Sequence, residues 1–542
     1  MAQVSSITGR GARWRMVLNT GIVMLGAVLS RLLGVIRDGI ISERFGIRPE
    51  LGAFTAAFAI PDLLYFVIIG GALGSALIPV FGRLLEEQQQ ERAWELANTI
   101  LTASFVIFVL IAALVAAFAR PLLAYTVASG YADDPAMLGL TVHLMRLMLI
   151  QPLLLGLGGL MMAILQTFER FTLPAIAFNI YNLSMIAAAL FLAPIYGIDG
   201  LAIGVAFGAL LYFLVQLPGV IRAGLRFKPS LNWRMPEVIR VGSLLAPRLI
   251  GQGALQLNII VMISLMSLIG SSAQAANRYA YQLLMLPHGI LAVSMGTVMF
   301  PRLTRLFAAG QQEDARHVSM QTLRTVLWLT VPAAALLAVL HVPILRLLFQ
   351  RGDFGAEALR MTGRALLFYT PGAIGLAGAE IVIRTFYAME DTYTPVIVGV
   401  ATIVLNGLLA WSMITYWQRD IGLIALAYSA TNMIEFVVLF GILARRLHGF
   451  EAAHFARSAL ALVFGTLALV LVLIATVWLS RPYVPGVTAD SPYGRGADFF
   501  VLAGWLACVG GLGLAAYVGV GALLRAPELR ELWSLVRRRH AS

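Results

Sequence analysis

Apolar runs of about 20 residues recur along the whole chain and constrain its fold more than any other feature. As a helix, a run of this length spans the ~30 Å hydrocarbon core of a bilayer. Of the 542 residues, 60% are hydrophobic and only 12% are charged, a balance foreign to soluble globular domains. A transmembrane β-barrel would instead show alternating segments of about ten residues, which the chain lacks. The sequence therefore predicts an all-α, polytopic membrane protein.

The transmembrane helices are expected to number about fourteen. They lie near 17–42, 51–80, 97–119, 138–165, 174–194, 198–221, 240–268, 272–300, 322–348, 358–387, 393–416, 420–444, 455–480 and 498–524. An even number returns the C-terminus to the side of the N-terminus. Lys and Arg collect in the loops that this topology assigns to the cytoplasm, so both termini are expected there. The first span is expected to remain uncleaved, because no small-residue cleavage site follows it.

An internal repeat divides the chain in two. The segment PVFGRLLEEQQQERA from Pro79 returns in modified form as PRLTRLFAAGQQEDA from Pro301, and the matching residues keep a constant offset. Corresponding spans lie six apart, so the halves share one orientation about an axis along the membrane normal, as in transporters that bind substrate between two halves. The predicted organisation is an N-lobe of 1–222, a C-lobe of 223–446, and a segment of 447–542 with two extra helices and a basic cytoplasmic tail.

The first predicted span carries three charged residues, Arg31, Arg37 and Asp38, in the stretch LSRLLGVIRDGI. A charge in hydrocarbon costs about 2.5–3.5 kcal/mol on insertion scales, and Arg31 is too deep to reach the interface, so it is expected to face a water-filled cavity. Arg31 and Asp38 share a helix face, and a bend at Gly34 would let Arg37 face the same cavity. Guanidinium groups suit a phosphate ligand. Two alternatives stay open: Arg37 and Asp38 could snorkel to the interface, and Asp38 could form an internal ion pair.

Further polar residues in the predicted spans extend this candidate site. Arg248 and Arg278 could line the same cavity, although Arg278 could also lie at the interface. Asn258 and Asn406 could coordinate a cation, but hydrogen bonding between helices is the favoured interpretation.

The chain offers no motif for catalysis or for binding a metal. Cys508 is the only cysteine, the seven histidines form no metal-ligand pattern, and no phosphate-binding ATPase loop is present. The net charge of +12 fits basic loops at an anionic membrane surface rather than a nucleic-acid partner. No cofactor is expected, and a coupling cation (sodium or a proton) or the membrane potential would drive transport. Glu380 and Arg384, four residues apart, are expected to neutralise each other.

Four segments together resemble the MurJ (MviN) family of lipid II flippases, in the superfamily of multidrug, oligosaccharidyl-lipid and polysaccharide exporters. They are SRLLGVIRDGIISERFG, AFTAAFAIPDLLYFVIIGGALGSALIPVF, LLMLPHGILAVSMGTVMFPRLTRLFAAG and RTFYAMEDTYTPVIVGV, and the resemblance covers about 18–446. It implies a transporter, not an enzyme, that moves undecaprenyl-pyrophosphate-linked muropeptide (lipid II) to the outer leaflet of the bacterial inner membrane for peptidoglycan synthesis. It also implies that Arg31, Arg37 and Asp38 engage the pyrophosphate, and that the two extra helices hold the lipid tail.

Several charged positions of the family differ in this chain. A family arginine in the eighth span aligns with Gln282, and Tyr65 and Phe66 stand where paired arginines are usual. We hypothesise that Arg248 and Arg278 replace part of this positive charge. Two alternative functions remain: export of another polyprenyl-linked oligosaccharide, and a flippase-like interaction protein that does not transport. A monomer is expected.

Overall fold

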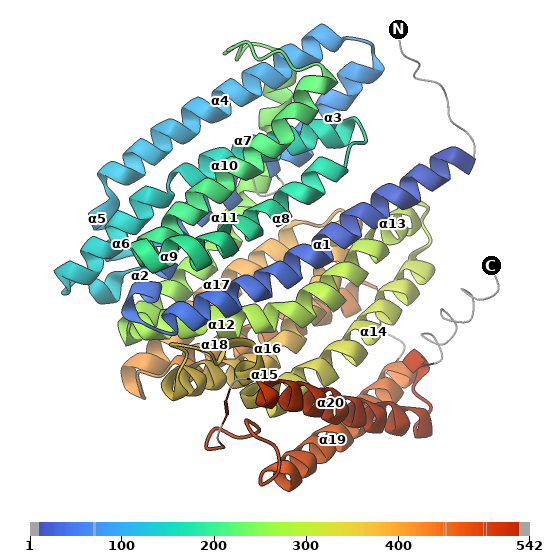
Figure 1. The fold of residues 1–542 in the computed structure, drawn as a ribbon. Helices are drawn as coiled ribbons and strands as arrows, with labels where there is room; N and C mark the ends of the chain where they lie inside the picture. Colours follow the sequence, from blue (N-terminus) through green and yellow to red (C-terminus); the bar gives the residue numbers. More distant parts are fainter. Residues whose placement is uncertain are drawn as a thin grey trace. The chain divides into compact units, whose positions relative to one another are not determined.

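The computed structural model describes residues 10–68, 72–447, 449, 452–491, 493–494 and 496–529 (Figure 1). Within helices, the description excludes the side chains of 10–25, 27–28, 67–68, 72–75, 246–248, 250–255 and 452–455. All regular elements of the described residues are helical. A helix satisfies its backbone hydrogen bonds internally, which lipid requires because it offers none. The chain forms two compact units, Met1–Ser267 and Leu268–Ser542.

In the first unit, α10 packs against both α7 and α8, α1 packs along α8, and α2 packs along α6. The elements of this unit are α1 (Arg10–Phe45), α2 (Pro49–Ile68), α3 (Ala72–Glu86), α4 (Gln90–Ala117), α5 (Ala119–Tyr125), η1 (Ser129–Tyr131), α6 (Pro135–Met148), α7 (Ile150–Thr167), α8 (Thr172–Ala187), η2 (Ala188–Leu192), α9 (Ala193–Tyr196), α10 (Ile198–Ala223) and α11 (Pro236–Ile269).

In the second unit, α16 is central and packs against α12, α14 and α18. The elements of this unit are α12 (Ser271–Pro287), η3 (His288–Val293), α13 (Ser294–Ala308), α14 (Gln312–Val339), α15 (His341–Phe349), α16 (Ala356–Ala388), α17 (Tyr393–Tyr416), α18 (Ile421–Arg446), α19 (Ala452–Ser480) and α20 (Ala497–Leu523).

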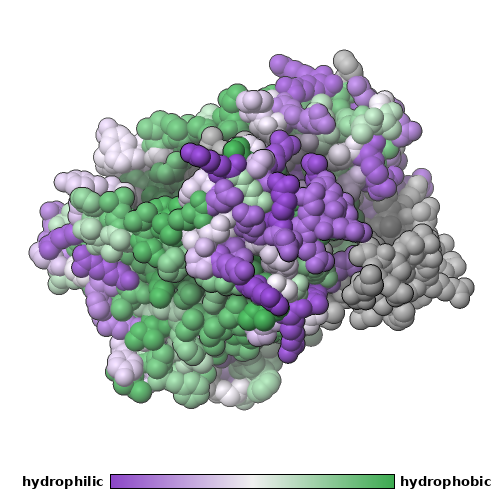
Figure 2. Space-filling model, turned by 90° about the horizontal axis from the view of Figure 1, so that it is seen from above, coloured by the Kyte–Doolittle hydropathy of each residue, from purple (hydrophilic) through white to green (hydrophobic). Residues whose placement is uncertain are grey.

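The described helices have the length and surface that a bilayer requires. Eleven segments of the described residues are long and apolar enough to cross a membrane, and each coincides with an expected span. The other three expected spans, near 17–42, 51–80 and 240–268, coincide with α1, with α2 and α3 together, and with α11. Figure 2 shows continuous hydrophobic surface (green) beside areas where hydrophilic residues (purple) gather. The predicted all-α, polytopic membrane fold is confirmed.

The internal repeat is visible in the helix boundaries. Pro79 and Pro301 are separated by the same number of residues as the first residues of α3 and α13, and as their last residues. The same separation holds for both ends of α4 and α14. The turns repeat as well: Gln88 and Gly310, at the same offset, have φ of 60° and 72°. A left-handed residue ends a helix by turning the chain away from its axis. The repeat therefore preserves both the helices and the way in which they end.

α11 is attached to the first unit by hydrogen bonds to η1. The backbone N–H of Gly130 donates to Ser267 Oγ at 2.9 Å, and the hydroxyls of Ser129 and Ser264 lie 3.1 Å apart. In the sequence repeat, α11 instead opens the second half. The compact units thus differ in extent from the repeat halves, and the lobes of 1–222 and 223–446 stay a prediction.

A row of glycines lets α16 and α18 approach closely. Gly372, Gly375 and Gly378 recur every three residues on α16. A Cβ at Gly375 would lie 2.6 Å from the carbonyl of Asn432 on α18. Helices in membranes associate through such small-residue contacts, because lipid provides no hydrophobic drive between them.

Replacing Gly375 with alanine is expected to destabilise this contact by about 1–3 kcal/mol, the usual cost of overpacking, despite alanine's higher helix propensity. Thermal unfolding of the purified protein in nanodiscs measures the effect. The matched control is Gly441→Ala on α18, where an added Cβ meets nothing within 4 Å. Equal unfolding temperatures for the two variants would contradict the close packing.

The pair α19 and α20 is joined to α14 by aromatic and charged contacts. The rings of Trp328 on α14 and Tyr517 on α20 have centroids 4.5 Å apart, and the Tyr517 hydroxyl donates to the Trp328 carbonyl at 2.8 Å. Beyond α20, the buried Glu528 carboxylate accepts a hydrogen bond from Ser458 on α19 and lies 3.8 Å from Nε of Arg324 on α14. This carboxylate therefore links the segment after α20 to α19 and α14.

Candidate functional site

α1 and α8 are held together by small residues and amide side chains. A Cβ at Gly26 would lie 3.0 Å from the Cβ of Ala175, so the helices approach closely there. Further along, Asn179 Nδ2 donates to the Gly26 carbonyl at 3.4 Å, and Asn182 Nδ2 donates to Ser30 Oγ at 3.0 Å. Carboxamides that hydrogen-bond between helices stabilise such contacts in membranes. This interface fixes the segment of α1 that carries the charged residues.

Arg37 and Asp38 form an ion pair in that segment. Nε of Arg37 lies 3.0 Å from Oδ1 of Asp38, and Nη2 lies 3.3 Å from Oδ2, a two-pronged geometry. Nη1 of Arg37 also donates to Oδ1 of Asn182 at 3.1 Å. Asp38 is completely buried. The internal ion pair, one of the alternatives for Asp38 in the sequence analysis, is thus present. The guanidinium of Arg37 is bonded to residues of the first unit.

The side chain of Arg31 differs from that of Arg37 in its exposure and in its partners. Its side chain is exposed, and within the described part of the chain its guanidinium has neither an ion pair nor a hydrogen bond. It lies at a pocket of about 330 Å³ formed by α1, α7 and α8. Of the three charges that the sequence singled out on α1, Arg31 is the one available to a ligand.

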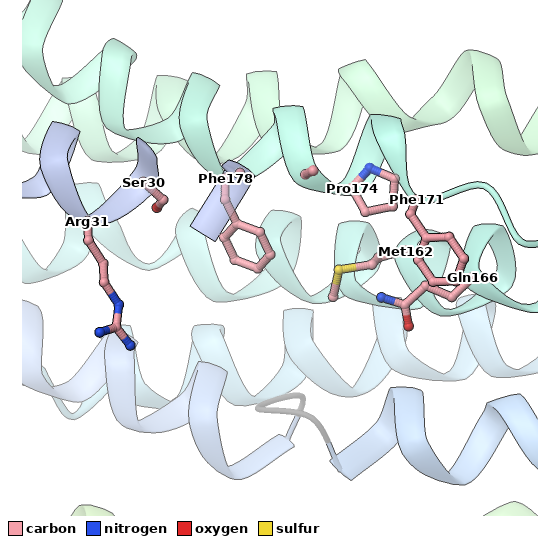
Figure 3. Close-up of a pocket in the computed structure, with 9 residues that line it drawn as sticks. Ser30, Arg31, Met162, Gln166, Phe171, Pro174 and Phe178 are labelled. Carbon is pink, nitrogen blue, oxygen red and sulfur yellow. The ribbon is translucent and has the colours of Figure 1, made fainter. Parts of the chain in front are cut away.

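The pocket beside Arg31 has a polar residue at each end and apolar walls between them. Figure 3 shows Arg31 and Ser30 at one end, Gln166 at the other, and Phe178 in between. The remaining lining side chains are apolar and include Met162, Phe171 and Pro174. Such a site suits a ligand that joins an anionic group to an apolar one.

Arg278 and Gln282 both lie on α12 in the second unit, one turn apart and half-buried. The helix is held beside α16 and α18 by a cluster of Tyr281, Tyr369 and Tyr428, whose ring centroids lie 5.5 to 6.0 Å apart. The Tyr369 hydroxyl also donates to Oδ1 of Asn277 at 2.7 Å. These contacts fix the orientation of the α12 segment that carries Arg278.

The other predicted site residues are spread over both units. Arg248 belongs to α11, but its side chain lies outside the described residues. Asn258 is half-buried on α11 in the first unit, whereas Asn406 is buried on α17 in the second. Among the residues that the structure describes, no group of three or more His, Cys, Asp or Glu side chains could hold a metal ion. The cation site at the two asparagines stays a prediction.

Two other intramembrane arginines have structural partners. Nε of Arg384 lies 2.6 Å from Oε1 of Glu380, so the predicted neutralisation of this pair is confirmed. The Arg146 guanidinium donates twice to the carbonyl of Ala116, at 3.1 and 3.0 Å, near the end of α4. Helix ends carry carbonyls without intrahelical partners, which explains this contact.

The motif MEDTYTP forms a polar turn between α16 and α17. The Asp391 carboxylate accepts hydrogen bonds from the backbone N–H of Thr394 at 3.0 Å, from its hydroxyl at 2.6 Å, and from the guanidinium of Arg446. Burial alone would raise the pKa of Asp391, but the bonds from Thr394 and Arg446 together lower it below its ordinary value. The ionised carboxylate therefore stabilises the turn.

A lowered pKa makes this stabilisation depend on pH. It is present above the ordinary aspartate pKa of about 4 and is lost as the pH falls through the lower pKa of the folded state. We expect Asp391→Asn to lower the unfolding temperature at pH 7, and the difference from the native chain to shrink toward pH 3. The control is Glu390→Gln, at the exposed neighbouring residue. A difference independent of pH would contradict this role of the charge.

The internally repeated set of membrane-spanning helices defines a polytopic membrane transporter, and Arg31, which has no partner among the described residues, lies beside its apolar pocket. The chain belongs to the lipid II flippase MurJ family, whose model matches residues 41–490. It is therefore a transporter of the flippase class and not an enzyme.

Comparison with individual proteins agrees with this assignment. A protein described as a probable lipid II flippase MurJ, from Buchnera aphidicola subsp. Acyrthosiphon pisum, is 28% identical over 459 residues, which cover 84% of this chain and 88% of the relative. A solved structure of a lipid II flippase MurJ in an inward closed conformation has a TM-score of 0.75 at 22% identity, over 92% of this chain and 98% of the other. A multidrug resistance MATE family transporter of the MOP superfamily has a TM-score of 0.62 at 14% identity, over 79% and 98%. The predicted family and superfamily fold are confirmed.

Sequence reasoning missed the residues of α7 and α8 that build the surroundings of Arg31. Asn179, Asn182 and Gln166 were not predicted to belong to the site. One signal was available, because Asn179 and Asn182 lie three apart in a mostly apolar span and so share a helix face.

Proposed function

We propose that this chain moves lipid II from the inner to the outer leaflet of the bacterial cytoplasmic membrane by alternating access. Membership of the lipid II flippase MurJ family supports this cargo. The observation that carries the proposal is the guanidinium of Arg31, which has no partner among the described residues and lies beside an apolar pocket. A pyrophosphate-linked lipid has both of the groups that such a site would bind.

In this proposal, Arg31 holds the pyrophosphate through two parallel hydrogen bonds. Arg37 and Asp38 contribute indirectly, since their ion pair and its bond to Asn182 keep α1 in place against α8. Arg278, with Arg248 and Gln282, adds polar groups from the later helices. The charged headgroup passes between an N-lobe of 1–222 and a C-lobe of 223–446.

The remaining features of the proposal concern the membrane. Both termini lie in the cytoplasm, because the basic loops favour that side. The protein acts as a monomer, and the lipid tail is held by α19 and α20. A coupling cation or the membrane potential drives the cycle.

Rescue of a bacterium depleted of its own lipid II flippase tests the function. We expect the native chain to restore growth and to make lipid II accessible to a lipid II-cleaving enzyme added outside the cells. A chain that is folded and inserted but restores neither would contradict lipid II as cargo. Export of another polyprenyl-linked oligosaccharide would then be examined with that lipid in proteoliposomes.

A further inference from the structure

The pocket beside Arg31 is divided between a charged end and an apolar interior. Arg31 and Ser30 contribute from α1, while the side chains of Met162, Phe171 and Phe178 provide apolar surface from α7, α8 and the turn between them. Figure 3 places Phe178 between the Arg31 end and the Met162 and Phe171 end. An anion held by Arg31 therefore has apolar side chains on one side of it.

Among the described residues that line the pocket, the polar groups are too few for a sugar. The Ser30 hydroxyl accepts a hydrogen bond from Asn182 and keeps its own O–H to donate, and the Gln166 amide is the other uncharged polar group among the described lining residues. A sugar brings several hydroxyls, and each hydroxyl buried against Met or Phe without a partner costs free energy. A hydrocarbon chain carries no such cost and gains from burial.

The size of the pocket limits how much hydrocarbon it can take. Its volume of about 330 Å³ is at the lower end of ligand pockets, which range over about 300–1,000 Å³. A long polyprenyl chain does not fit, whereas a short branched segment next to the phosphate does.

From this arrangement we propose that the pocket formed by α1, α7 and α8 binds the first isoprene units of the lipid carrier, next to the pyrophosphate that Arg31 holds. The inference rests on the proposed function for the identity of the anion. It adds a subsite in the first unit that recognises the lipid by its allylic end. The rest of the tail stays outside this pocket.

Binding of small pyrophosphates to the purified full-length protein in nanodiscs tests the subsite. The probes are inorganic pyrophosphate, geranyl pyrophosphate with two isoprene units, and UDP-N-acetylglucosamine as a pyrophosphate that carries a sugar. We expect geranyl pyrophosphate to bind at least about tenfold more tightly than the other two, since burying several carbons contributes well over a factor of ten.

Met162→Gln places an amide in the apolar wall and is expected to weaken geranyl pyrophosphate binding about tenfold without weakening inorganic pyrophosphate. Ile150→Gln is the matched control, because Ile150 is exposed on the same helix and does not line the pocket. Geranyl pyrophosphate partitions into the nanodisc equally for both variants, so their difference reports the pocket. Unfolding temperatures of both variants verify that they are folded.

Three results would overturn the subsite. They are equal affinity of the native chain for geranyl and inorganic pyrophosphate, tighter binding of the sugar pyrophosphate, and equal effects of Met162→Gln and Ile150→Gln. None of these alters the rescue experiment, which decides the transport function separately. Failure of rescue with an intact geranyl preference would leave the subsite standing for another polyprenyl-linked cargo.

Discussion

Replacing Arg31 with alanine is expected to abolish rescue of a flippase-depleted bacterium while leaving the amount of folded protein in the membrane unchanged. The guanidinium has no partner in the described part of the chain, so its removal leaves no buried group unpaired. A charge-assisted hydrogen bond contributes about 1.5–3 kcal/mol, and loss of two such bonds to pyrophosphate lowers transport by about 100-fold or more. Growth, membrane abundance and lipid II exposure are measured together.

The matched control is Arg44→Ala, which removes an exposed arginine from the same helix outside the pocket. Arg31→Lys keeps the charge but loses the planar fork, so partial rescue is expected. Full rescue by Arg31→Ala would contradict the proposed mechanism and would favour an interaction protein that does not transport.

Arg37→Ala is expected to act differently. Arg37 is paired with the completely buried Asp38 and donates to Asn182 on α8, so its loss breaks a buried ion pair and a contact that holds α1 against α8. The expected result is less folded protein rather than a folded protein that fails to transport. The contrast between the two arginines separates binding of the substrate from support of α1.

Replacing Glu528 with alanine is expected to loosen α19 and α20 from α14. The exposed fractions of Glu528 and Arg324 are 1% and 5%, and breaking such a buried ion pair by removing one member costs about 3 kcal/mol. Hydrogen–deuterium exchange should rise in peptides of α19 and α20 before it rises in α16 or α18. If these two helices hold the lipid tail, transport should fall as well.

Glu313→Ala is the control for this prediction, since Glu313 is an exposed acid on α14, the helix of Arg324. The double variant Arg324→Met, Glu528→Met should recover most of the lost protection, because replacing both members of a buried pair by apolar residues is close to neutral. Exchange in Glu528→Ala equal to that in Glu313→Ala would show that the pair does not hold these helices.

Much of the fold was predictable because the signals are local. Span length follows from bilayer thickness, and the constant offset of the repeat appears directly in the segments from Pro79 and Pro301. The ends of α3, α4, α13 and α14 follow that offset because the same turns are repeated. The pairing of Glu380 with Arg384 was predictable for the same reason, since a helix brings residues four apart together.

The candidate site was less predictable because it depends on contacts between distant segments. Helix geometry alone places Arg31 and Asp38 on one face, with Arg37 turned away from both. The long flexible side chain of Arg37 and the amide of Asn182 on α8 instead bring the Arg37 guanidinium to Asp38. The pocket likewise requires Met162 and Phe178 from two later helices, and no spacing in the sequence connects either of them to Arg31.

The ion pair on α1 has an electrical consequence. Arg37 and Asp38 together carry no net charge. Among the described side chains of α1 as far as Asp38, a transmembrane voltage therefore acts chiefly on Arg31. Moving one elementary charge through 100 mV changes the free energy by about 2.3 kcal/mol. A displacement of the segment from Arg31 to Asp38 within the field would therefore count as one gating charge, to which the Arg37–Asp38 pair adds nothing. During such a movement, Arg31 would cancel part of the charge of the bound anion. The voltage dependence of transport would then measure how far Arg31 and the anion move together through the membrane field.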